Sequence, residues 1–235
     1  MFKKLIYLLS FVLVLSTAGS ATAELVGWWR FDDGSGTIAS DTSSNGNDGM
    51  FHGDPQWVAG HFRGALEFDG SGDWLDCGTG QSLRFGDAVT ITAWIKINAL
   101  YTDQKIAGNQ NVSAGYKMAV YSNNKVEFEI RSSLNTTTSN RNSAGRTVLA
   151  SGEWYHVAGV YSLQEGYIRT YVNGVLDREL TTTAELGVSP ESFKIGCDPY
   201  NTGANPFNGA MDDLRVYNTA LTEDEIIAVM EEGKV

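Results

Sequence analysis

Oxygen-bearing side chains that could hold a metal ion gather at a few places in this chain. One is the pair Asp212 and Asp213, and a short loop from Asp69 to Asp73 is another. The densest lies within residues 32–48, among glycines and serines: Asp32, Asp33, Asp41, Asn45, Asn47 and Asp48. Calcium takes about six to eight oxygen ligands from carboxylates, carbonyls and water, and none of these places has EF-hand spacing. The alternative is that these residues only form Asx turns.

A catalytic site is the next possibility. Glycoside hydrolysis needs two carboxylates, one as the acid and one as the nucleophile or base. Glu127 and Glu129 share one face of a predicted strand, but the third acid of a Glu-x-Asp-x-x-Glu motif is missing, so an exposed charged strand face explains the pair better. His52, His61 and His156 lack a nucleophile-elbow context and the spacing of zinc ligands. The sequence therefore predicts that the protein is not an enzyme.

Aromatic residues could bind a ligand by stacking. Trp94 lies on the strand face opposite Val89, Ile91 and Ile95, and an exposed or groove-lining position there would suit a sugar ring. A second predicted strand places three further candidates on one face: Tyr167, Arg169 and Tyr171. These four residues are the candidate ligand-binding surface. The alternatives are cross-strand aromatic pairs that stabilise a sheet and burial in a core.

The elements that must position these residues are mainly strands. Residues 89–97 alternate between apolar and other side chains, as expected for a strand with one buried face. Many short strands follow, separated by turns such as Asn173-Gly174, a two-residue hairpin signal. Only residues 222–232 have a helical pattern, and a capping box of Thr222 and Glu225 opens it. These signals predict an all-β, two-sheet sandwich with one short C-terminal helix.

The closing strand contains a break in its alternation. Leu214 and Val216 alternate with polar partners, but Met211 does not share their parity. Met211 and Leu214 can both face the core only if one extra residue is inserted between them. We therefore predict a β-bulge at Asp212 and Asp213, a device that re-aims side chains.

Three segments of the sequence carry a resemblance to a known family. Residues 207–221 read FNGAMDDLRVYNTAL, close to the family pattern F-x-G-x-I-D-D-V-R-I-Y-N-x-A-L. Residues 29–37 read WRFDDGSGT, and residues 64–75 read GALEFDGSGDWL, followed by ITAWIK at 91–96. Together they resemble the LamG-like jellyroll family of the concanavalin A-like lectin/glucanase superfamily, related to laminin G and pentraxin domains. The resemblance implies an antiparallel jellyroll sandwich.

The resemblance also suggests a function. It implies a noncatalytic binding module that recognises extracellular carbohydrate or a surface protein. The alternatives are a polysaccharide-active enzyme, either a glycoside hydrolase or a lyase, and a structural or assembly jellyroll without a small ligand. Many relatives bind calcium, and their first and last strands tend to lie close together. The resemblance therefore implies a calcium site that draws on both ends of the domain: Asp32, Asp41, Asn45, Asp212 and Asp213.

The first residues have the features of a secretory signal peptide. Lys3 and Lys4 precede an apolar run at residues 5–15, and Ala21-Thr22-Ala23 fits the cleavage pattern. The run is shorter than the roughly 20 residues that span a bilayer, so we expect no membrane insertion. We predict a signal peptide at residues 1–23, one LamG-like jellyroll domain at residues 24–235, and a periplasmic or extracellular location.

Charge and cysteine content narrow the partners and the covalent structure. Without Lys3 and Lys4 the chain has 15 basic and 28 acidic residues, a net charge of −13. Such a surface repels phosphate backbones, so we expect no nucleic-acid partner. Export permits a disulfide between Cys77 and Cys197, which lie at predicted strand ends. Two free buried thiols are the alternative.

Overall fold

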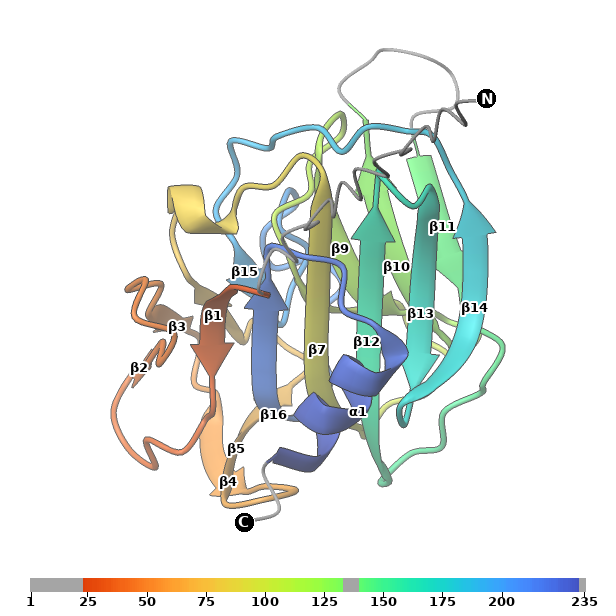
Figure 1. The fold of residues 1–235 in the computed structure, drawn as a ribbon. Coiled ribbons are helices and arrows are strands. Elements are labelled where there is room, and N and C mark those ends of the chain that lie inside the picture. Colours follow the sequence, from red (N-terminus) through yellow and green to blue (C-terminus); the bar gives the residue numbers. More distant parts are fainter. Residues whose placement is uncertain (1–22, 133–139, 233–235) are drawn as a thin grey trace, which may run out of the picture.

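Two eight-stranded sheets form the body of the protein in the computed structural model, which describes residues 23–132 and 140–232. Seven of the eight strands of sheet A follow one another in the order β14 (Val175–Thr181), β13 (Tyr167–Val172), β12 (Trp154–Ser162), β7 (Ala88–Ile97), β16 (Asn208–Tyr217), β5 (Gly64–Asp69) and β4 (Gln56–Ala59). Its eighth strand, β1 (Leu25–Trp29), pairs with β16. Sheet A is the near layer in Figure 1.

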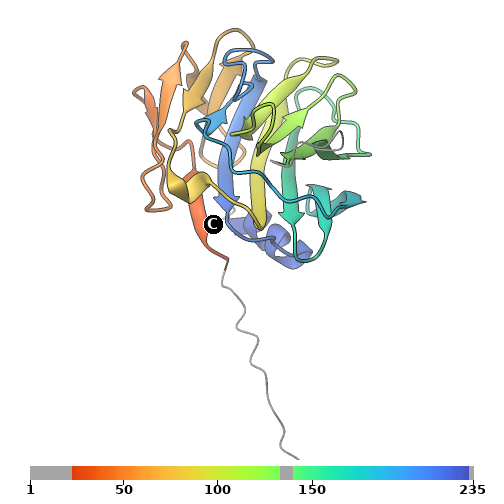
Figure 2. The ribbon, with the colours of Figure 1, turned by 90° about the horizontal axis from the view of Figure 1, so that it is seen from above.

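Sheet B lies behind sheet A in Figure 1, and the two layers face one another when seen from above in Figure 2. Its order is β11 (Asn140–Ala144), β10 (Val126–Arg131), β9 (Gly115–Val120), β8 (Gln104–Gly108), β15 (Lys194–Ile195), β6 (Trp74–Asp76), β3 (Gly49–His52) and β2 (Ile38–Ala39). All pairings between these strands are antiparallel. The predicted all-β, two-sheet sandwich is confirmed.

The core lies between the two sheets and follows from the alternation of the strands. In β7 the apolar face is fully buried, and β10, which lies across from β12 and β13, contributes its own apolar face to the same core. The residues that meet there include Val89, Ile91, Ala93, Ile95, Ile97, Val126, Phe128 and Ile130. Because successive side chains of a strand point to opposite faces, the residues between these core positions point to the outer faces of the sandwich.

The predicted bulge in β16 is present at the Asp pair. The register of β16 against β7 shifts between Asp212 and Arg215, and Asp213 adopts the left-handed region with φ 50°. Met211 and Leu214 are both fully buried as a result. The opposite edge of β16 changes partner at the same place, because β5 pairs up to Met211 and β1 pairs from Leu214. Asp is one of the few non-glycine residues that visit this region routinely.

The short helix α1 (Glu223–Glu232) covers part of the outer face of sheet A (Figure 1). Its predicted capping box is present, since Glu225 N–H donates to Thr222 Oγ1 and Thr222 N–H donates to Glu225 Oε2. Ile226 and Val229 pack with buried aromatics of β13 and β16, in a small cluster separate from the main core. An η1 turn, Gln81–Leu83, precedes β7.

The possible disulfide between Cys77 and Cys197 is absent, and both cysteines are buried free thiols, which was the alternative that the sequence left open. The register of β15 against β6 gives the reason. Lys194 pairs with Asp76 and Ile195 with Leu75, so Cys77 falls opposite Phe193. Cys197 then lies four residues away along the ladder, or about 13 Å at the rise of a strand. That exceeds the roughly 4.4–6.8 Å between Cα atoms that a disulfide needs.

The described part of the chain contains no helix that is both long and apolar enough to span a bilayer. The predicted signal peptide, residues 1–23, lies outside the described residues except for Ala23.

Candidate functional site

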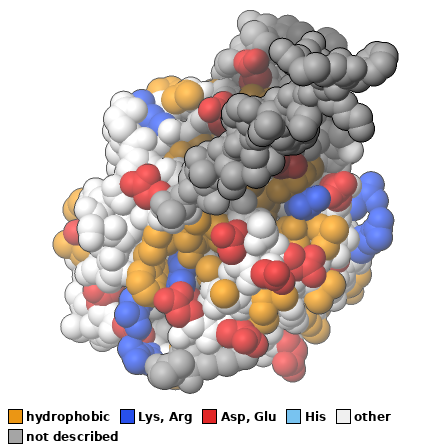
Figure 3. All heavy atoms as spheres, viewed as in Figure 1, with side chains coloured by type: hydrophobic (Ala, Val, Ile, Leu, Met, Phe, Trp, Pro, Cys, Tyr) orange, Lys and Arg blue, Asp and Glu red, His pale blue; other side chains and the backbone are white. Residues whose placement is uncertain are grey.

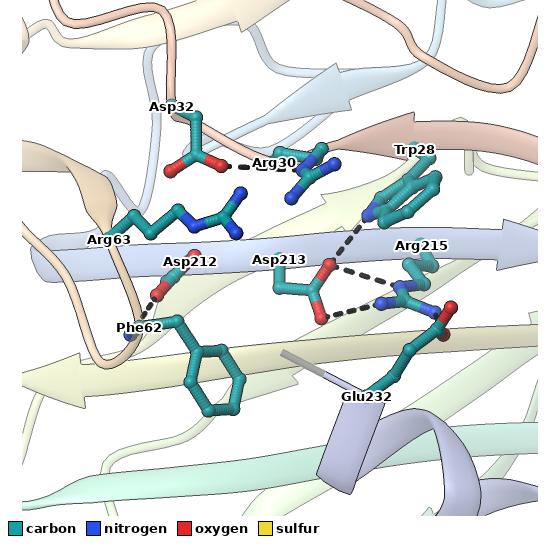
Figure 4. A pocket seen from close by; sticks show the side chains of 9 residues that line it. All are labelled: Trp28, Arg30, Asp32, Phe62, Arg63, Asp212, Asp213, Arg215 and Glu232. Carbon is teal, nitrogen blue, oxygen red and sulfur yellow. Dashed lines mark hydrogen bonds and ion pairs between the residues drawn. The ribbon is translucent and has the colours of Figure 1, made fainter. Parts of the chain in front are cut away.

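The bulge in β16 forms the floor of an open hollow on the outer side of sheet A, which we call the sheet A pocket (Figure 4). Its volume is about 530 Å³, including solvent space at the mouth. Three parts of the chain far apart in sequence supply its walls, together with the last turn of α1. The lining residues are Trp28, Arg30, Asp32, Phe62, Arg63, Asp212, Asp213, Arg215 and Glu232.

A buried ion pair anchors the pocket. Arg215 is only 3% exposed, and its Nε and Nη2 atoms each lie 3.0 Å from an oxygen of Asp213. Trp28 donates its indole N–H to Asp213 at 2.6 Å, and its ring lies 4.3 Å from the Arg215 guanidinium. Glu232 of α1 pairs with the remaining end of Arg215. The pair therefore connects β1, β16 and α1.

Asp212 is the second acid of the bulge and has a different environment. It is 2% exposed, and its Oδ2 accepts a hydrogen bond from Phe62 N–H at 3.0 Å. Burial is the main cause that raises the pKa of Asp212 to about 7, and the neighbouring charges of Asp213 and Asp32 add to it. The Phe62 amide acts in the opposite direction. Near neutral pH this carboxyl group is therefore present in both its protonated and its ionised form.

The loop that Asp212 holds covers one of the predicted ligand residues. Trp94 is 7% exposed, and His61 stacks on its indole with ring centroids 3.6 Å apart. Phe62 meets the same indole edge-on. Trp94 Nε1, His156 Nδ1 and Thr92 Oγ1 have no hydrogen-bond partner among the described residues. The aromatic surface expected at Trp94 is thus present but covered. His156 is buried, as expected of a structural residue.

The other three predicted ligand residues lie on the outer face of β13, away from the sheet A pocket. Tyr171 is buried against the cluster beneath α1. Arg169 lies over the ring of Tyr167 at 3.7 Å and pairs with Glu179 at 2.7 Å. The structure therefore does not bring Trp94 together with these residues around one hollow.

The five predicted calcium ligands are divided between two places. Asp32, Asp212 and Asp213 line the sheet A pocket, where Asp32 pairs with Arg30 and accepts Gly64 N–H. Asp41 lies elsewhere and accepts the backbone N–H groups of Trp28, Ser43 and Asn47, each at 2.9 Å. Asn45 contacts Ser43 beside it. The bond from Ser43 to Asp41 is the Asx-turn pattern that was the alternative interpretation.

A different set of acids brings its oxygen atoms together. Among the described residues, one carboxylate group of three has ligand atoms all within 4.8 Å of one another: Asp54, Asp69 and Asp73, here called the acid trio. Two of its members belong to the second candidate loop of the sequence. Asp54 was not predicted, although the register of β4 against β5 continues to place it opposite Asp69. The trio borders a hollow of about 460 Å³ that Asn98 and Asn208 also line.

Asp73 organises the acid trio. It accepts the backbone N–H groups of Asp54 at 2.8 Å and of Asp69 at 3.1 Å. Burial is the largest influence on its carboxyl group and raises its pKa, while these two amides lower it. A nearby cation would offset the cost of keeping three acids together. The donors are all oxygen atoms, so the trio suits calcium better than a soft metal.

Comparisons with known proteins bear on the family and the fold. A family model described as "Concanavalin A-like lectin/glucanases superfamily" matches residues 69–227. A comparison with curated proteins gave no match.

Several solved structures are similar. The binding domain of Paraclostridial Mosquitocidal Protein 1 has 14% identity and a TM-score of 0.72, over 89% of this chain and 52% of that one. Domain 4 of AbnA, a GH43 extracellular arabinanase from Geobacillus stearothermophilus, in complex with arabinotriose, has 19% identity and a TM-score of 0.66, over 88% and 98%. The receptor binding domain of a botulinum neurotoxin C/D mosaic serotype has 16% identity and a TM-score of 0.67, and the match covers 89% of this chain and 51% of that one. This chain spans about half the length of the first and third, and these likenesses show the fold.

Proposed function

Because this chain belongs to the concanavalin A-like lectin/glucanase superfamily, we propose that it is an exported, noncatalytic module that binds extracellular carbohydrate. The observation that carries the proposal is the sheet A pocket, where carboxylates, guanidinium groups and two aromatic rings surround one open hollow (Figure 4). The signal peptide expected at residues 1–23 supports export to the periplasm or out of the cell. The similar structures support a binding role, since their names describe binding domains or a bound arabinotriose.

The chemistry of the pocket matches the groups on a sugar. Carboxylates accept hydrogen bonds from hydroxyl groups and guanidinium groups donate to them, and charge-assisted bonds of this kind are the stronger ones. In Figure 4 Arg30, Arg63 and Asp32 lie together at one side of the pocket, whereas Asp213 points toward Arg215. Apart from Glu232 in α1, the pocket residues come from strands or from short segments beside them, which holds their geometry. Phe62 and Trp28 supply the apolar surface that pockets for small ligands need.

The charge of the pocket favours a neutral sugar. Three arginines face four acids, and Asp212 is only partly ionised near neutral pH because burial raises its pKa to about 7. Acidic side chains are also spread over the surrounding surface and over α1 (Figure 3). An anionic glycan would be repelled there, whereas hydroxyl groups would not.

A polysaccharide-cleaving enzyme is the second candidate, and Asp212 is the observation that favours it. A carboxylic acid that keeps its proton near pH 7, beside an ionised carboxylate, is the arrangement that glycoside hydrolases use. Asp212, however, is 2% exposed and is hydrogen-bonded to Phe62 N–H, which leaves little room for a glycosidic oxygen. A binding role accounts for this burial better.

Binding to a neutral oligosaccharide should depend on Asp32. We expect the protein to bind neutral members of a glycan array, and Asp32→Asn to weaken the binding of the best hit at least tenfold in calorimetry, or about 1.4 kcal/mol. The matched control is Asp33→Asn, whose carboxylate bonds Ser40 instead of lining the pocket, and it should bind like the wild type. Equal affinities of the two variants, or no neutral hit, would contradict this site. Release of reducing sugar that Asp212→Asn abolishes would establish the enzyme instead.

Calcium should stabilise the protein through the acid trio. A cation that binds only the folded state raises the melting temperature, by roughly 5 °C or more when calcium is about 100-fold above its Kd. We expect this rise on adding calcium and its loss with excess EDTA or in Asp69→Asn. Asp32→Asn, from the calcium set that the sequence suggested, should keep the response. The reverse pattern would move calcium to the sheet A pocket, and no shift in the wild type would remove it from the proposal.

A further inference from the structure

A second polar hollow lies on the outer face of sheet B, on the opposite side of the sandwich from the sheet A pocket. We call it the sheet B groove. It has a volume of about 380 Å³, and its lining includes Gln110, Lys117, Arg131, Asp198, Tyr200 and Asn201. Lys117 points outward because its neighbours in β9, Tyr116 and Met118, belong to the core. The function proposed above makes no use of this groove.

The floor of the groove holds two cations in fixed positions. Lys117 is 9% exposed and Glu129 is 8% exposed, although the sequence suggested an exposed strand face around Glu129. Lys117 Nζ lies 3.4 Å from Glu129 Oε2 and 3.9 Å from Asp198 Oδ2. Arg131 Nη2 lies 3.2 Å from Glu129 Oε1, and Nη1 donates to the carbonyl of Val112 at 2.9 Å. These contacts fix both cationic groups before any ligand arrives.

One donor in this arrangement lacks an acceptor. Arg131 Nε is buried and has no hydrogen-bond partner among the described residues, whereas Nη2 on the same edge of the guanidinium contacts Glu129. A guanidinium presents its N–H groups as a planar fork that matches two carboxylate oxygens. Glu129 uses one side of the fork only. A buried donor without an acceptor costs free energy, so an acceptor from a ligand would be favourable there.

The rim of the groove carries an exposed aromatic ring on which a ring-shaped ligand could stack. Tyr200 is 55% exposed, which leaves its ring available for stacking. The loop that carries it is held in place, because Asp198 accepts the N–H groups of Tyr200 at 3.1 Å and Asn201 at 3.0 Å. Lys194 Nζ also donates to the carbonyl of Pro199 at 2.7 Å. An exposed tyrosine on an ordered loop offers contact area at a low entropic cost.

From these observations we infer that the sheet B groove is a second saccharide site, which selects a sugar unit carrying a carboxylate. Counting Glu129 in its floor, the groove holds two cations and two acids and is locally neutral, on a protein whose net charge without residues 1–23 is −13, so an anion is repelled less there than over the acidic surface in general. The carboxylate would contact Lys117 and the partly exposed guanidinium of Arg131, and a small shift of that side chain would bring Nε to it. The hydroxyl groups would contact Gln110 and Asn201, and the ring would stack on Tyr200. The inference stands independently of the sheet A pocket.

The test uses matched acidic and neutral sugars with the mature protein. Calorimetry would compare trigalacturonate with its methyl ester, and sialyllactose with lactose, to cover two sources of a carboxylated sugar. We expect at least one acidic probe to bind at least tenfold more tightly than its neutral partner. Arg131→Lys, which keeps the charge and removes the Nε donor, should lose about tenfold in affinity for that probe. Tyr200→Ala should also weaken binding, whereas the exposed Tyr101, outside the groove, provides Tyr101→Ala as the control.

Three outcomes would overturn the inference. One is that neither acidic probe binds, and another is that the acidic and neutral partners bind equally. The third is that Arg131→Lys and Tyr200→Ala both bind the acidic probe like the wild type. In that case the affinity of Asp32→Asn would show whether the probe binds in the sheet A pocket. Circular dichroism and melting temperature check that each variant is folded. If Arg131→Lys does not fold, the affinities of Tyr200→Ala and Tyr101→Ala for the acidic probe are compared instead.

Discussion

Replacing Asp213 with alanine should lower the free energy of unfolding by about 3–5 kcal/mol, because it removes the buried partner of the Arg215 guanidinium and leaves only Glu232, whose side chain is 59% exposed, beside it. Arg215 is 3% exposed and forms a bidentate ion pair with Asp213. The same substitution removes the acceptor of the Trp28 indole N–H. Since the ion pair joins β1, β16 and α1, its loss should also loosen the wall of the sheet A pocket.

The control for this prediction is an ion pair between an arginine and a carboxylate that is more exposed to solvent. Arg169 and Glu179 lie 2.7 Å apart, but their side chains are 28% and 42% exposed. Glu179→Ala should therefore cost about 1 kcal/mol or less. Urea denaturation at one pH measures both variants. If Asp213→Ala came within about 1 kcal/mol of Glu179→Ala, the pair would not be the anchor that its burial indicates.

The features that could be predicted from the sequence depend on local patterns. The alternation at residues 89–97 fixes which side of β7 is buried. The mismatch in parity between Met211 and Leu214 locates the bulge, since a strand can bury both only by inserting a residue. Thr222 and Glu225 mark the start of α1 because their reciprocal hydrogen bonds form within one turn.

The features that could not be predicted depend on segments from other parts of the chain, which cover a sheet face or add a residue to a cluster. Alternation places Trp94 on an outer face, but the loop bearing His61, from another part of the chain, covers that face. Likewise, Tyr171 lies beneath α1, which periodicity in β13 does not reveal. The acid trio needs Asp54, whose position opposite Asp69 follows from strand register and not from spacing along the chain.

The dependence of stability on pH should reveal the environment of Asp212. Burial raises its folded-state pKa from the ordinary 3.8 to about 7, so between these values the folded protein keeps a proton that the unfolded chain releases. Its contribution to stability is full below the unfolded pKa and is lost as the pH rises toward 7, at about 1.4 kcal/mol per pH unit. Asp212→Asn removes this loss. Relative to wild type, the variant should therefore gain stability as the pH rises from 4 to 7, and the difference should level off above about 8.

His156 should act in the opposite direction over nearly the same range, and this makes the prediction about Asp212 specific. Burial, with the nearby charges of Arg215 and His61, lowers the pKa of His156 from 6.5 to about 3. The unfolded chain then binds a proton that the folded protein excludes, so this residue costs stability as the pH falls below 6.5. In the wild type the folded state holds one extra proton on Asp212 and lacks one on His156, so the two slopes largely cancel between about pH 4 and 6.5. Urea denaturation across this range should show stability rising with pH in Asp212→Asn and falling in His156→Gln. Parallel curves for the two variants would mean that neither group is held in the charge state that its burial implies.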